Sequence, residues 1–472
     1  MVNCHVVLLP FTAYGHLIPM ADMAVLFASR GLQTTIITSP LNAHRFSKSV
    51  QKTANFPHQI ALHIAEPKAP EAGQPPLDDT SISQESIFGF REFVSMLQEP
   101  VEQFIQESRP NCLIADMFYP WTTKTAAKFD IPRIVFHGTG FFPLCASESI
   151  RLYEPHKAVS SDLEPFIIPH LPHEIKLTRK QLPNLEAEIF KEFVEVMMES
   201  VEVDATSYGV IVNSFSELEP EYVWHYREVM KRKTWHIGPV WLCNKILDDK
   251  SERGKKASIH EDECLRWLEL KSPNSVVYLS FGSLVEATAS QVFEIAMGLE
   301  ACGESFIWVI KNEQERSLPE GFEVRMKALG KGLIITGWAP QTLILDHESV
   351  GGFVTHCGWN SVLEGLAGGV SMVTWPVMAE QFHNAKLVTD VLEIGVSIGD
   401  LEWSATASCD GVKREAVEKA VAKVMGAEEG EKMRKWARVL KEKAKTVVEE
   451  GGSSYLDLNA FIEDIKTFKS KQ

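Results

Sequence analysis

The first half of the sequence alternates short, wholly apolar runs with longer segments of helical periodicity. The run "HVVLLPF" at residues 5–11 is followed by a helix-like stretch at 18–31, and further apolar runs occur at 34–39, 112–117 and 133–138. Strands without a polar face are typical of a parallel sheet that helices cover on both sides. We therefore expect a doubly wound α/β unit in this half.

A polar stretch then interrupts the pattern, and the same alternation begins again after it. Residues 247–258, "LDDKSERGKKAS", have no apolar period and are typical of an interdomain linker. The later apolar runs lie at 275–282, 306–311, 333–338, 351–356 and 371–376. A length of 472 residues also favours more than one core. We expect two tandem α/β domains, at residues 1–246 and 259–452, and a last helix at 453–472 that packs back on the first domain.

The charge and cysteine patterns argue against several other classes of protein. The formal net charge is -16, whereas a nucleic-acid or anionic-membrane partner requires a basic surface. The eight cysteines are dispersed, and no C-x-x-C pair indicates a disulfide framework or a zinc site. No apolar run approaches the roughly 20 residues that cross a bilayer. We expect a cytoplasmic monomer without nucleic acid and without stable membrane insertion.

The stretch "GGFVTHCGWNSVLEGLAGG" at residues 351–369 begins as a short apolar run, breaks at a Gly and continues with the periodicity of a helix. The first N–H groups of a helix have no partner within it, so they attract an anion such as a phosphate. Because no Lys or Arg lies between Lys331 and Lys386, we expect neutral donors here. The chain has no Asp-x-Asp pair to hold a metal ion, no P-loop, and no G-x-G-x-x-G after its first strand. We expect neither a metal nor a cofactor.

Other polar or aromatic residues lie where a bound nucleotide sugar would extend. A Gly-Ser loop, "SFGS", ends an apolar run at residues 280–283. Trp338 closes another run and offers a face on which a base can stack. Glu364 lies one turn inside the helix, where its carboxylate can accept from two ribose hydroxyls. Glu380 and Gln381 open the next helical segment, where they can hydrogen-bond a polyol.

Residues 338–381 resemble the 44-residue donor-binding signature of plant secondary-product glycosyltransferases. They read "WAPQTLILDHESVGGFVTHCGWNSVLEGLAGGVSMVTWPVMAEQ", and segments such as "FHGTGFF" and "AEQFHNAKLV" extend the resemblance over nearly the whole chain. The family uses UDP-sugars and has the GT-B fold, in which two Rossmann-like domains face a cleft. The subgroup that this sequence resembles most acts on flavonoids and triterpenoids. The resemblance implies an N-terminal acceptor-binding domain and a C-terminal UDP-sugar-binding domain.

The resemblance also implies a role for each matching residue of the donor site. Trp338 would stack on uracil, whose edge would meet the Ala339 backbone and Gln341. Glu364 would hold the ribose, and the phosphates would be held by Ser283, His356, Asn360 and Ser361. The sugar would contact Trp359, Glu380, Gln381 and, from the first half of the chain, Thr139. Gln at position 381 is associated in the family with glucose, and Trp359 stands where an Arg would indicate glucuronate.

In the first half, the resemblance implies that His16 is the catalytic base and Asp116 its charge partner. An acceptor hydroxyl is a poor nucleophile, and a His with a pKa of about 6.5 can take its proton during attack. A carboxylate on the other ring nitrogen would stabilise the imidazolium that forms. If the base and the leaving group lie on opposite faces of the anomeric carbon, one displacement inverts an α-linked donor into a β-glycoside.

Several aromatic residues follow strand ends, where core packing and an apolar acceptor wall are alternatives. These residues are Phe118, Tyr119, Trp121, Phe141 and Phe142. Tyr14 and Ala379 are further acceptor candidates. Tyr14 stands where Gln or His is commoner in the family, and "GVSM" replaces the usual "GVPM". The expected function is the transfer of glucose from UDP-glucose to a hydroxyl of an apolar plant metabolite.

Other functions stay open at this point. A UDP-sugar-binding protein without catalysis would use the same fold, and a transferase could use another donor sugar or form a C-glycoside. Cys357 lies near a helix N-terminus, which can lower a thiol pKa, so a cysteine-dependent acyl transfer is a third alternative. Against it, neighbouring residues of a strand point to opposite faces, so His356 is badly placed to act as the base for Cys357.

Overall fold

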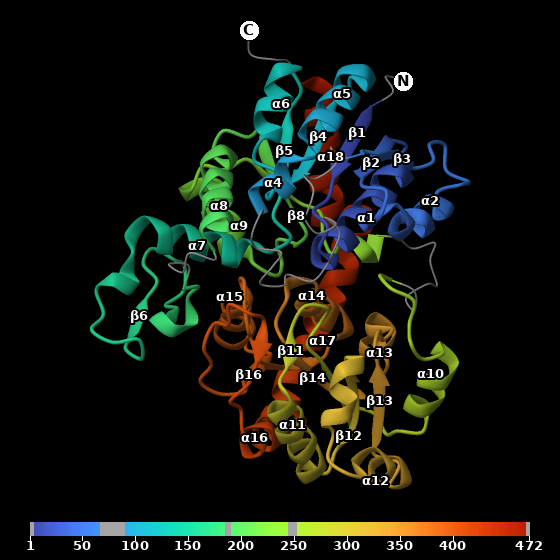
Figure 1. The fold of residues 1–472 in the computed structure, drawn as a ribbon, viewed down its shortest axis with the longest axis vertical. Coiled ribbons are helices and arrows are strands. Elements are labelled where there is room, and N and C mark those ends of the chain that lie inside the picture. The colour runs from blue at the N-terminus through green and yellow to red at the C-terminus, as the bar shows by residue number, and fades with distance from the viewer. Residues whose placement is uncertain (1–3, 67–89, 185–189, 244–252, 469–472) are drawn as a thin grey trace, which may run out of the picture. The chain divides into compact units, whose positions relative to one another are not determined.

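A computed structural model describes residues 4–66, 90–184, 190–243 and 253–468. The chain forms two compact units (Figure 1): the first comprises residues 1–141, 185–246 and 447–472, and the second comprises residues 142–184 and 247–446. Of the expected linker, residues 247–252 lie outside the described residues, and residues 253–258 contain neither helix nor strand. The expected domain boundaries stay a prediction, and residues 142–184 group with the second unit.

A parallel sheet forms the centre of the first unit. In the described parts of the chain it has seven strands, in the order β3-β2-β1-β4-β5-β8-β9. The strands are β1 (His5–Leu9), β2 (Gln33–Thr38), β3 (Ala61–Ile64), β4 (Cys112–Asp116), β5 (Arg133–Phe136), β8 (Gly209–Val212) and β9 (Thr234–His236). The strand order reverses between β1 and β4. Ligands of such sheets bind at the carboxyl ends of the strands beside this switch point.

Helices cover both faces of this sheet. They are α1 (Tyr14–Ser29), α2 (Ser47–Lys52), α4 (Phe90–Ser95), α5 (Gln98–Ser108), α6 (Thr122–Lys128), α8 (Lys191–Asp204), α9 (Pro220–Trp224) and α18 (Ser453–Thr467). Short 3-10 or π turns lie at Ala43–Phe46, His225–Val229 and Val240–Cys243. Side chains of α1 and α18 share one buried cluster with the sheet, and those of α4 and α5 share another.

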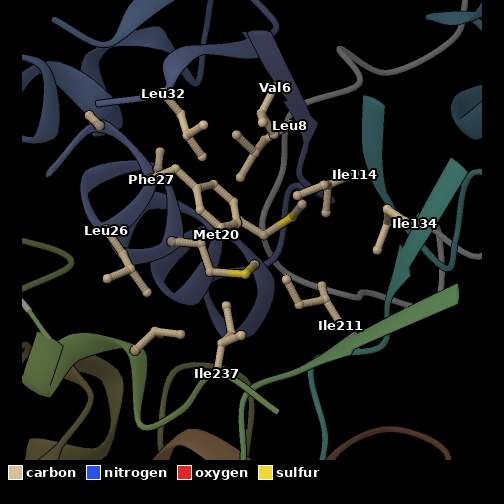
Figure 2. Close-up of a cluster of buried hydrophobic side chains, with 14 of the residues drawn as sticks. Val6, Leu8, Met20, Leu26, Phe27, Leu32, Ile114, Ile134, Ile211 and Ile237 are labelled. Atoms are coloured by element: carbon tan, nitrogen blue, oxygen red, sulfur yellow. The ribbon is translucent and has the colours of Figure 1, made fainter. Parts of the chain in front are cut away.

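The central strands of this sheet are largely apolar because they bury both of their faces. Val6 and Leu8 of β1 point into the cluster that Met20 and Phe27 of α1 fill (Figure 2). Val7, between them, belongs to the cluster on the opposite face. Successive strand residues point to opposite sides of a sheet, so neither face of β1 is left for polar side chains.

The second unit repeats this plan. In the residues that the structure describes, its parallel sheet has six strands, in the order β13-β12-β10-β14-β15-β16. They are β10 (Val276–Ser280), β12 (Ser305–Ile310), β13 (Gly332–Thr336), β14 (Val350–Thr355), β15 (Ser371–Thr374) and β16 (Gly395–Ser397). The order reverses between β10 and β14, which places the switch point at Ser280 and Thr355. Two small paired elements complete the strands: β6 (Pro165–Ile167) with β7 (Lys176–Thr178), and β11 (Glu286–Ala287) with β17 (Ser408–Cys409).

The helices of this unit follow the strands along the chain. They are α10 (Glu261–Glu269), α11 (Ala289–Cys302), α12 (Phe322–Ala328), α13 (Gln341–Asp346), α14 (Trp359–Gly368), α15 (Gln381–Lys386), α16 (Arg414–Met425) and α17 (Glu429–Val447). Helix α7 (Phe141–Tyr153) begins at the end of the first unit and continues into residues grouped with the second. Short turns lie at Pro155–Lys157, Arg179–Gln181, Asn312–Ser317 and Leu387–Val391.

The first helix begins earlier than its periodicity predicts. The pattern indicated a start near Ile18, whereas α1 begins at Tyr14. Gly15 and Pro19 have low helix propensity, and they obscure the first turn in the sequence. As a result, His16 lies in the first turn of a helix.

Candidate functional site

In the first unit, the switch point between β1 and β4 brings His16 and Asp116 together. Asp116 is the last residue of β4, and His16 follows β1 in the first turn of α1. His16 Nδ1 lies 2.6 Å from Asp116 Oδ2. The Asp116 side chain is fully buried, while one fifth of the His16 side chain is exposed. A buried carboxylate on Nδ1 leaves Nε2 as the nitrogen that can take a proton.

Two further contacts hold this pair in place. Asp116 Oδ1 accepts from the backbone N–H of Phe118 at 3.2 Å. Gly138 lies against the ring of His16, with a φ of +72°, and a Cβ there would be 3.1 Å from His16 Cε1. Only glycine adopts this backbone conformation readily and leaves room for the ring. The next residue, Thr139, has a buried hydroxyl without a hydrogen-bond partner among the described residues.

Two aromatic rings pack against His16. Phe11 packs edge-on to His16 with centroids 5.8 Å apart, and Phe118 lies 5.6 Å away. Phe118 in turn contacts Phe90 and Phe193. Of the predicted acceptor residues, Phe118 is thus the one that touches His16, and the neighbouring phenylalanines were not predicted.

Apart from Ala379, the other predicted acceptor residues are buried. Trp121 is buried and donates its indole N–H to the Val94 carbonyl at 2.7 Å. Tyr119 packs on Trp121 and is also buried. Phe141 and Phe142 are fully buried at the start of α7. Tyr14, in the first turn of α1, is mostly buried beneath the Arg45 guanidinium. Ala379, in the second unit, is exposed and has a φ of +49°.

In the second unit, the switch point between β10 and β14 holds His356. The loop after β10 passes over its ring at Gly282, where φ is +68° and a Cβ would lie 2.6 Å from His356 Cε1. Burial lowers the pKa of His356 to about 4. His356 is therefore neutral near pH 7 and acts as an uncharged hydrogen-bonding group. Ser283, in the same loop, is half-buried.

Helix α14 begins at Trp359, immediately after the turn that follows β14, and supplies the N–H groups expected of an anion site. Trp359, Asn360 and Ser361 form its first turn, and the indole of Trp359 is almost fully buried. Cys357 precedes the helix in the left-handed region, with a φ of +64°. Its thiol is buried, and burial raises its pKa far above the ordinary value. That is the opposite of a reactive thiol, so the geometry argues against a cysteine nucleophile.

One helical turn further, Glu364 is held by two side chains. Gln341 Nε2 donates to Glu364 Oε2 at 2.6 Å and to Ser361 Oγ at 3.1 Å, while Gln341 Oε1 accepts from Tyr278 at 3.2 Å. Arg253 forms an ion pair with Glu364 Oε1. The side chain of Gln341 contacts Glu364 in this structure, and its predicted place at the uracil edge stays a prediction.

Trp338 is half-buried at the end of β13, and a loop segment lies beside it. Its indole N–H donates to the Arg253 carbonyl at 3.2 Å, and its backbone N–H donates to Ser258 Oγ at 2.9 Å. The Ser258 N–H donates back to the Trp338 carbonyl at 2.7 Å. Ala339, next in the chain, is buried.

The predicted sugar-binding pair lies at the start of α15. Gln381 Oε1 accepts from the backbone N–H groups of Val377 and Met378 at 2.9 and 3.0 Å. Its amide nitrogen is therefore the atom left to bind a ligand, as a donor. Asn384 joins the neighbouring Glu380 to the turn before α14, because its Nδ2 donates to Glu380 Oε1 at 3.2 Å and to the Cys357 carbonyl at 2.9 Å.

The described residues contain no group of three or more His, Cys, Asp or Glu side chains arranged to hold a metal ion. None of their helices is long and apolar enough to cross a membrane.

A family model described as UDP-glucuronosyl and UDP-glucosyl transferase matches residues 11–425, which include His16, Asp116 and His356. The chain belongs to this family. The glycosyltransferase is 54% identical to scopoletin glucosyltransferase of Nicotiana tabacum, with 100% of this chain and 99% of the relative covered. It is 50% identical to UDP-glucose flavonoid 3-O-glucosyltransferase 7 of Fragaria ananassa, over 98% of this chain and 96% of the relative.

Solved structures agree with this assignment. UGT73P12 of Glycyrrhiza uralensis, complexed with glycyrrhetinic acid 3-O-monoglucuronide, superposes with a TM-score of 0.89 at 38% identity, over 99% of this chain and 96% of that chain. UGT71G1 of Medicago truncatula, complexed with UDP-glucose, gives 0.80 at 28% identity, over 98% of both chains. The plant glycosyltransferase family and the GT-B fold, predicted from the sequence, are confirmed.

Sequence reasoning missed several residues of the glycosyltransferase site. Nothing in the sequence marks Arg253, because 111 residues separate it from Glu364. Phe11 follows a strand, as Phe118 does, and that signal was available. Asn384 lies four residues after Glu380, one helical turn along, so its contact with Glu380 was also predictable.

Proposed function

We propose that this glycosyltransferase moves glucose from UDP-glucose to a hydroxyl of an apolar plant metabolite, with inversion at the anomeric carbon. The observation that carries the proposal is the 2.6 Å contact between His16 Nδ1 and Asp116 Oδ2 at a switch point. A protein that only binds UDP-sugars has no need of an imidazole that is one fifth exposed and held by a fully buried carboxylate, so the pair favours an enzyme.

In the proposed reaction, His16 Nε2 takes the proton of the acceptor hydroxyl as its oxygen attacks the anomeric carbon. Asp116 stays ionised and stabilises the imidazolium. The bond from the anomeric carbon to the UDP oxygen breaks on the opposite face, so an α-linked donor gives a β-glucoside. Glucose transfer stays a proposal, as does the choice of oxygen over carbon as the attacking atom.

The UDP leaving group is assigned to the second unit. The N–H groups at the start of α14, with neutral His356 and Ser283, would stabilise the departing diphosphate through hydrogen bonds and the helix dipole. Trp338 would stack on uracil, and Glu364 would hold the ribose. Glu380 would accept from sugar hydroxyls while the Gln381 amide donates to one, and Thr139 offers a hydroxyl that has no partner among the described residues.

The acceptor is proposed to be a planar or ring-rich alcohol. The named relatives act on scopoletin and on flavonoids, and the Glycyrrhiza structure holds a glycoside of glycyrrhetinic acid. The rings of Phe11 and Phe118 beside His16 suit such molecules. We also propose that the first domain binds the acceptor, that the second binds the donor, and that the protein works as a cytoplasmic monomer.

The direct test is a transfer assay with UDP-glucose and a panel that contains scopoletin, a flavonol and a triterpenoid alcohol. We expect a mass gain of one hexose, UDP release in equal amount, and a β-anomeric proton by NMR. UDP binding without transfer to any acceptor would favour the non-catalytic alternative. A product that resists acid hydrolysis would instead indicate a C-glycoside.

A further inference from the structure

Arg253 brings a positive charge to a donor site whose own sequence contains none. The donor signature, residues 338–381, has no Lys or Arg. Arg253 reaches it from outside and forms an ion pair with Glu364 Oε1. The side chains of both partners are largely buried, with 15% of Arg253 and 8% of Glu364 exposed. This contact lies wholly within the second unit.

The ion pair occupies the carboxylate that a ribose would use. Glu364 Oε2 is already taken by Gln341 Nε2 at 2.6 Å, and Arg253 covers Oε1. Because so little of Glu364 is exposed, a ligand hydroxyl reaches it only if one of these two partners moves. Gln341 is fixed at the first residue of α13 by its contacts with Tyr278 and Ser361.

Arg253 is the partner that can move. It lies in residues 253–258, which contain no helix or strand, and the adjacent Lys255 and Lys256 are exposed. The backbone of this segment is anchored at both ends, since the Trp338 indole N–H donates to the Arg253 carbonyl and Ser258 exchanges two hydrogen bonds with the Trp338 backbone. Rotation of the Arg253 side chain would therefore release the guanidinium while the backbone of the segment stays beside Trp338.

We propose that Arg253 sets the donor affinity of this enzyme by holding Glu364 in the ligand-free protein, so that a bound ribose must displace the guanidinium. The proposal rests on the ribose role of Glu364 given above. Part of the nucleotide's binding free energy is then spent on breaking the Arg253–Glu364 pair. Removal of the guanidinium should strengthen nucleotide binding, which is the opposite of the effect expected for a cation that contacts phosphate.

Calorimetry with UDP tests this directly. Arg253→Ala should bind UDP about 5- to 50-fold more tightly than wild type, as expected for loss of one competing charged hydrogen bond. The control, Lys255→Ala, removes the same charge from an exposed neighbour and should leave the Kd unchanged. Weaker or unchanged UDP binding by Arg253→Ala would overturn the proposal. A wild-type protein that fails to bind UDP would instead contradict the proposed function itself.

Two further measurements test whether the ribose displaces the Arg253 guanidinium from Glu364 or whether residues 253–258 affect UDP binding in another way. In a Glu364→Gln background, Arg253→Ala should no longer change the Kd for UDP, because the ion pair is already lost. In limited trypsin digestion followed by mass spectrometry, UDP should raise cleavage after Arg253 several-fold relative to cleavage after Lys256. Cleavage after Arg253 that falls or stays constant relative to Lys256 would contradict displacement.

Discussion

His16 and His356 both lie at switch points, yet their surroundings give them different chemistry. His16 has a buried carboxylate 2.6 Å from Nδ1, and that charge stabilises the protonated ring. His356 Nδ1 is buried without a partner among the described residues, and burial lowers the pKa of His356 to about 4. The first is suited to take a proton, and the second is suited to stay neutral beside a phosphate.

The first prediction concerns the catalytic pair. His16→Ala should lower kcat by at least about 100-fold, the usual effect of losing a general base, while the Kd for UDP stays unchanged. Asp116→Asn should also lower kcat, because the imidazolium loses its charge partner. His44→Ala, at an exposed histidine of the same unit, is the control and should be fully active. If His16→Ala lost UDP binding but kept its turnover per bound donor, His16 would be a donor ligand.

The second prediction concerns the choice of sugar at Gln381. Its Oε1 is held by two backbone N–H groups, so only its amide nitrogen is left to bind a ligand. Gln381→Glu keeps an oxygen that can accept from the two backbone N–H groups but has no N–H with which to donate to the sugar. We expect the preference for UDP-glucose over UDP-galactose in kcat/KM to fall about 5- to 150-fold, the cost of an unsatisfied polar group.

Gln381→Asn provides a comparison for this test, because it keeps the amide but shortens its reach. The shorter side chain should disturb both its contacts with the two backbone N–H groups and the position of its own amide N–H. The variant should therefore lose activity with every UDP-sugar. A wild-type preference for UDP-galactose or UDP-glucuronate, or unchanged discrimination by Gln381→Glu, would rule out the role assigned to Gln381.

The third prediction concerns pH and His383. Burial lowers the pKa of His383 to about 4, and neither ring nitrogen has a partner in the described parts of the chain. The unfolded chain takes up this proton below pH 6.5 while the folded protein does not, so stability falls as the pH drops from about 6.5 towards 4. For this one group the loss at pH 5 is about 2 kcal/mol.

The variant His383→Leu should lack the loss of stability that His383 causes at low pH. Between pH 7 and pH 5 the unfolding free energy should decrease in both proteins, and the decrease should be about 2 kcal/mol smaller in the variant than in wild type. Urea titration at both pH values measures this difference. His260→Leu, at an exposed histidine of the same unit, should keep the wild-type pH dependence. Parallel pH dependence of His383→Leu and wild type would show that His383 is not buried in its neutral form.

At the scale of elements, the loop after β10 and the start of α14 form the feature that we propose to bind phosphate. His356, after β14, lies between them, and Gly282 makes the close approach possible. Asn384 then connects this feature to α15 through the Cys357 carbonyl and Glu380. The proposed phosphate and sugar contacts are thus fixed relative to one another by side chains that need not touch the donor.

The fourth prediction belongs to this loop. Gly282→Ala should weaken UDP binding by roughly 10-fold or more, because a Cβ would displace His356 and the left-handed backbone costs a further 1–2 kcal/mol. Gly411→Ala is the matched control, since Gly411 also has a positive φ but no atom near its missing Cβ. Calorimetry should show normal UDP affinity for Gly411→Ala. Equal losses in both variants would mean that backbone strain alone, not His356, accounts for the effect.

At the scale of the whole molecule, the last helix completes the core of the first unit. Helix α18 follows α17 in the chain, but its side chains pack in the cluster of β1, α1 and β9. Asp457 on this helix pairs with Arg227, and Ser454 donates to the Gly238 carbonyl. The stability of the first unit therefore depends on residues that lie 200 and more positions away in sequence.

The fifth prediction follows from this packing. Phe461 is fully buried between Phe27 and Trp235, so Phe461→Ala should destabilise the first unit by about 3–5 kcal/mol. UDP binding, assigned to the second unit, should survive at temperatures where glucosyl transfer is lost. Leu456→Ala, at an exposed site on the same helix, is the control and should stay near wild-type stability. Simultaneous loss of UDP binding and transfer would show that the two units unfold together.

The sequence by itself determined the features that local pattern encodes. Apolar runs of strand length predicted both parallel sheets, because strands buried on two faces exclude polar residues wherever they lie in the chain. The turn into α14 predicted an anion site, since an unpaired helix N-terminus depends only on neighbouring residues. The resemblance of residues 338–381 identified the family, which the comparisons confirmed.

Only the tertiary structure decided which distant side chains meet. His16 and Asp116 are 100 residues apart, and their contact depends on the pairing of β1 with β4. The ion pair of Arg253 with Glu364 has no sequence signal, since it depends on where a segment without regular structure lies. The oxygen of Gln381 is likewise engaged by backbone groups whose position the residue type does not reveal. Periodicity reports burial along one element, whereas a hydrogen bond or ion pair also needs the positions of two elements in space.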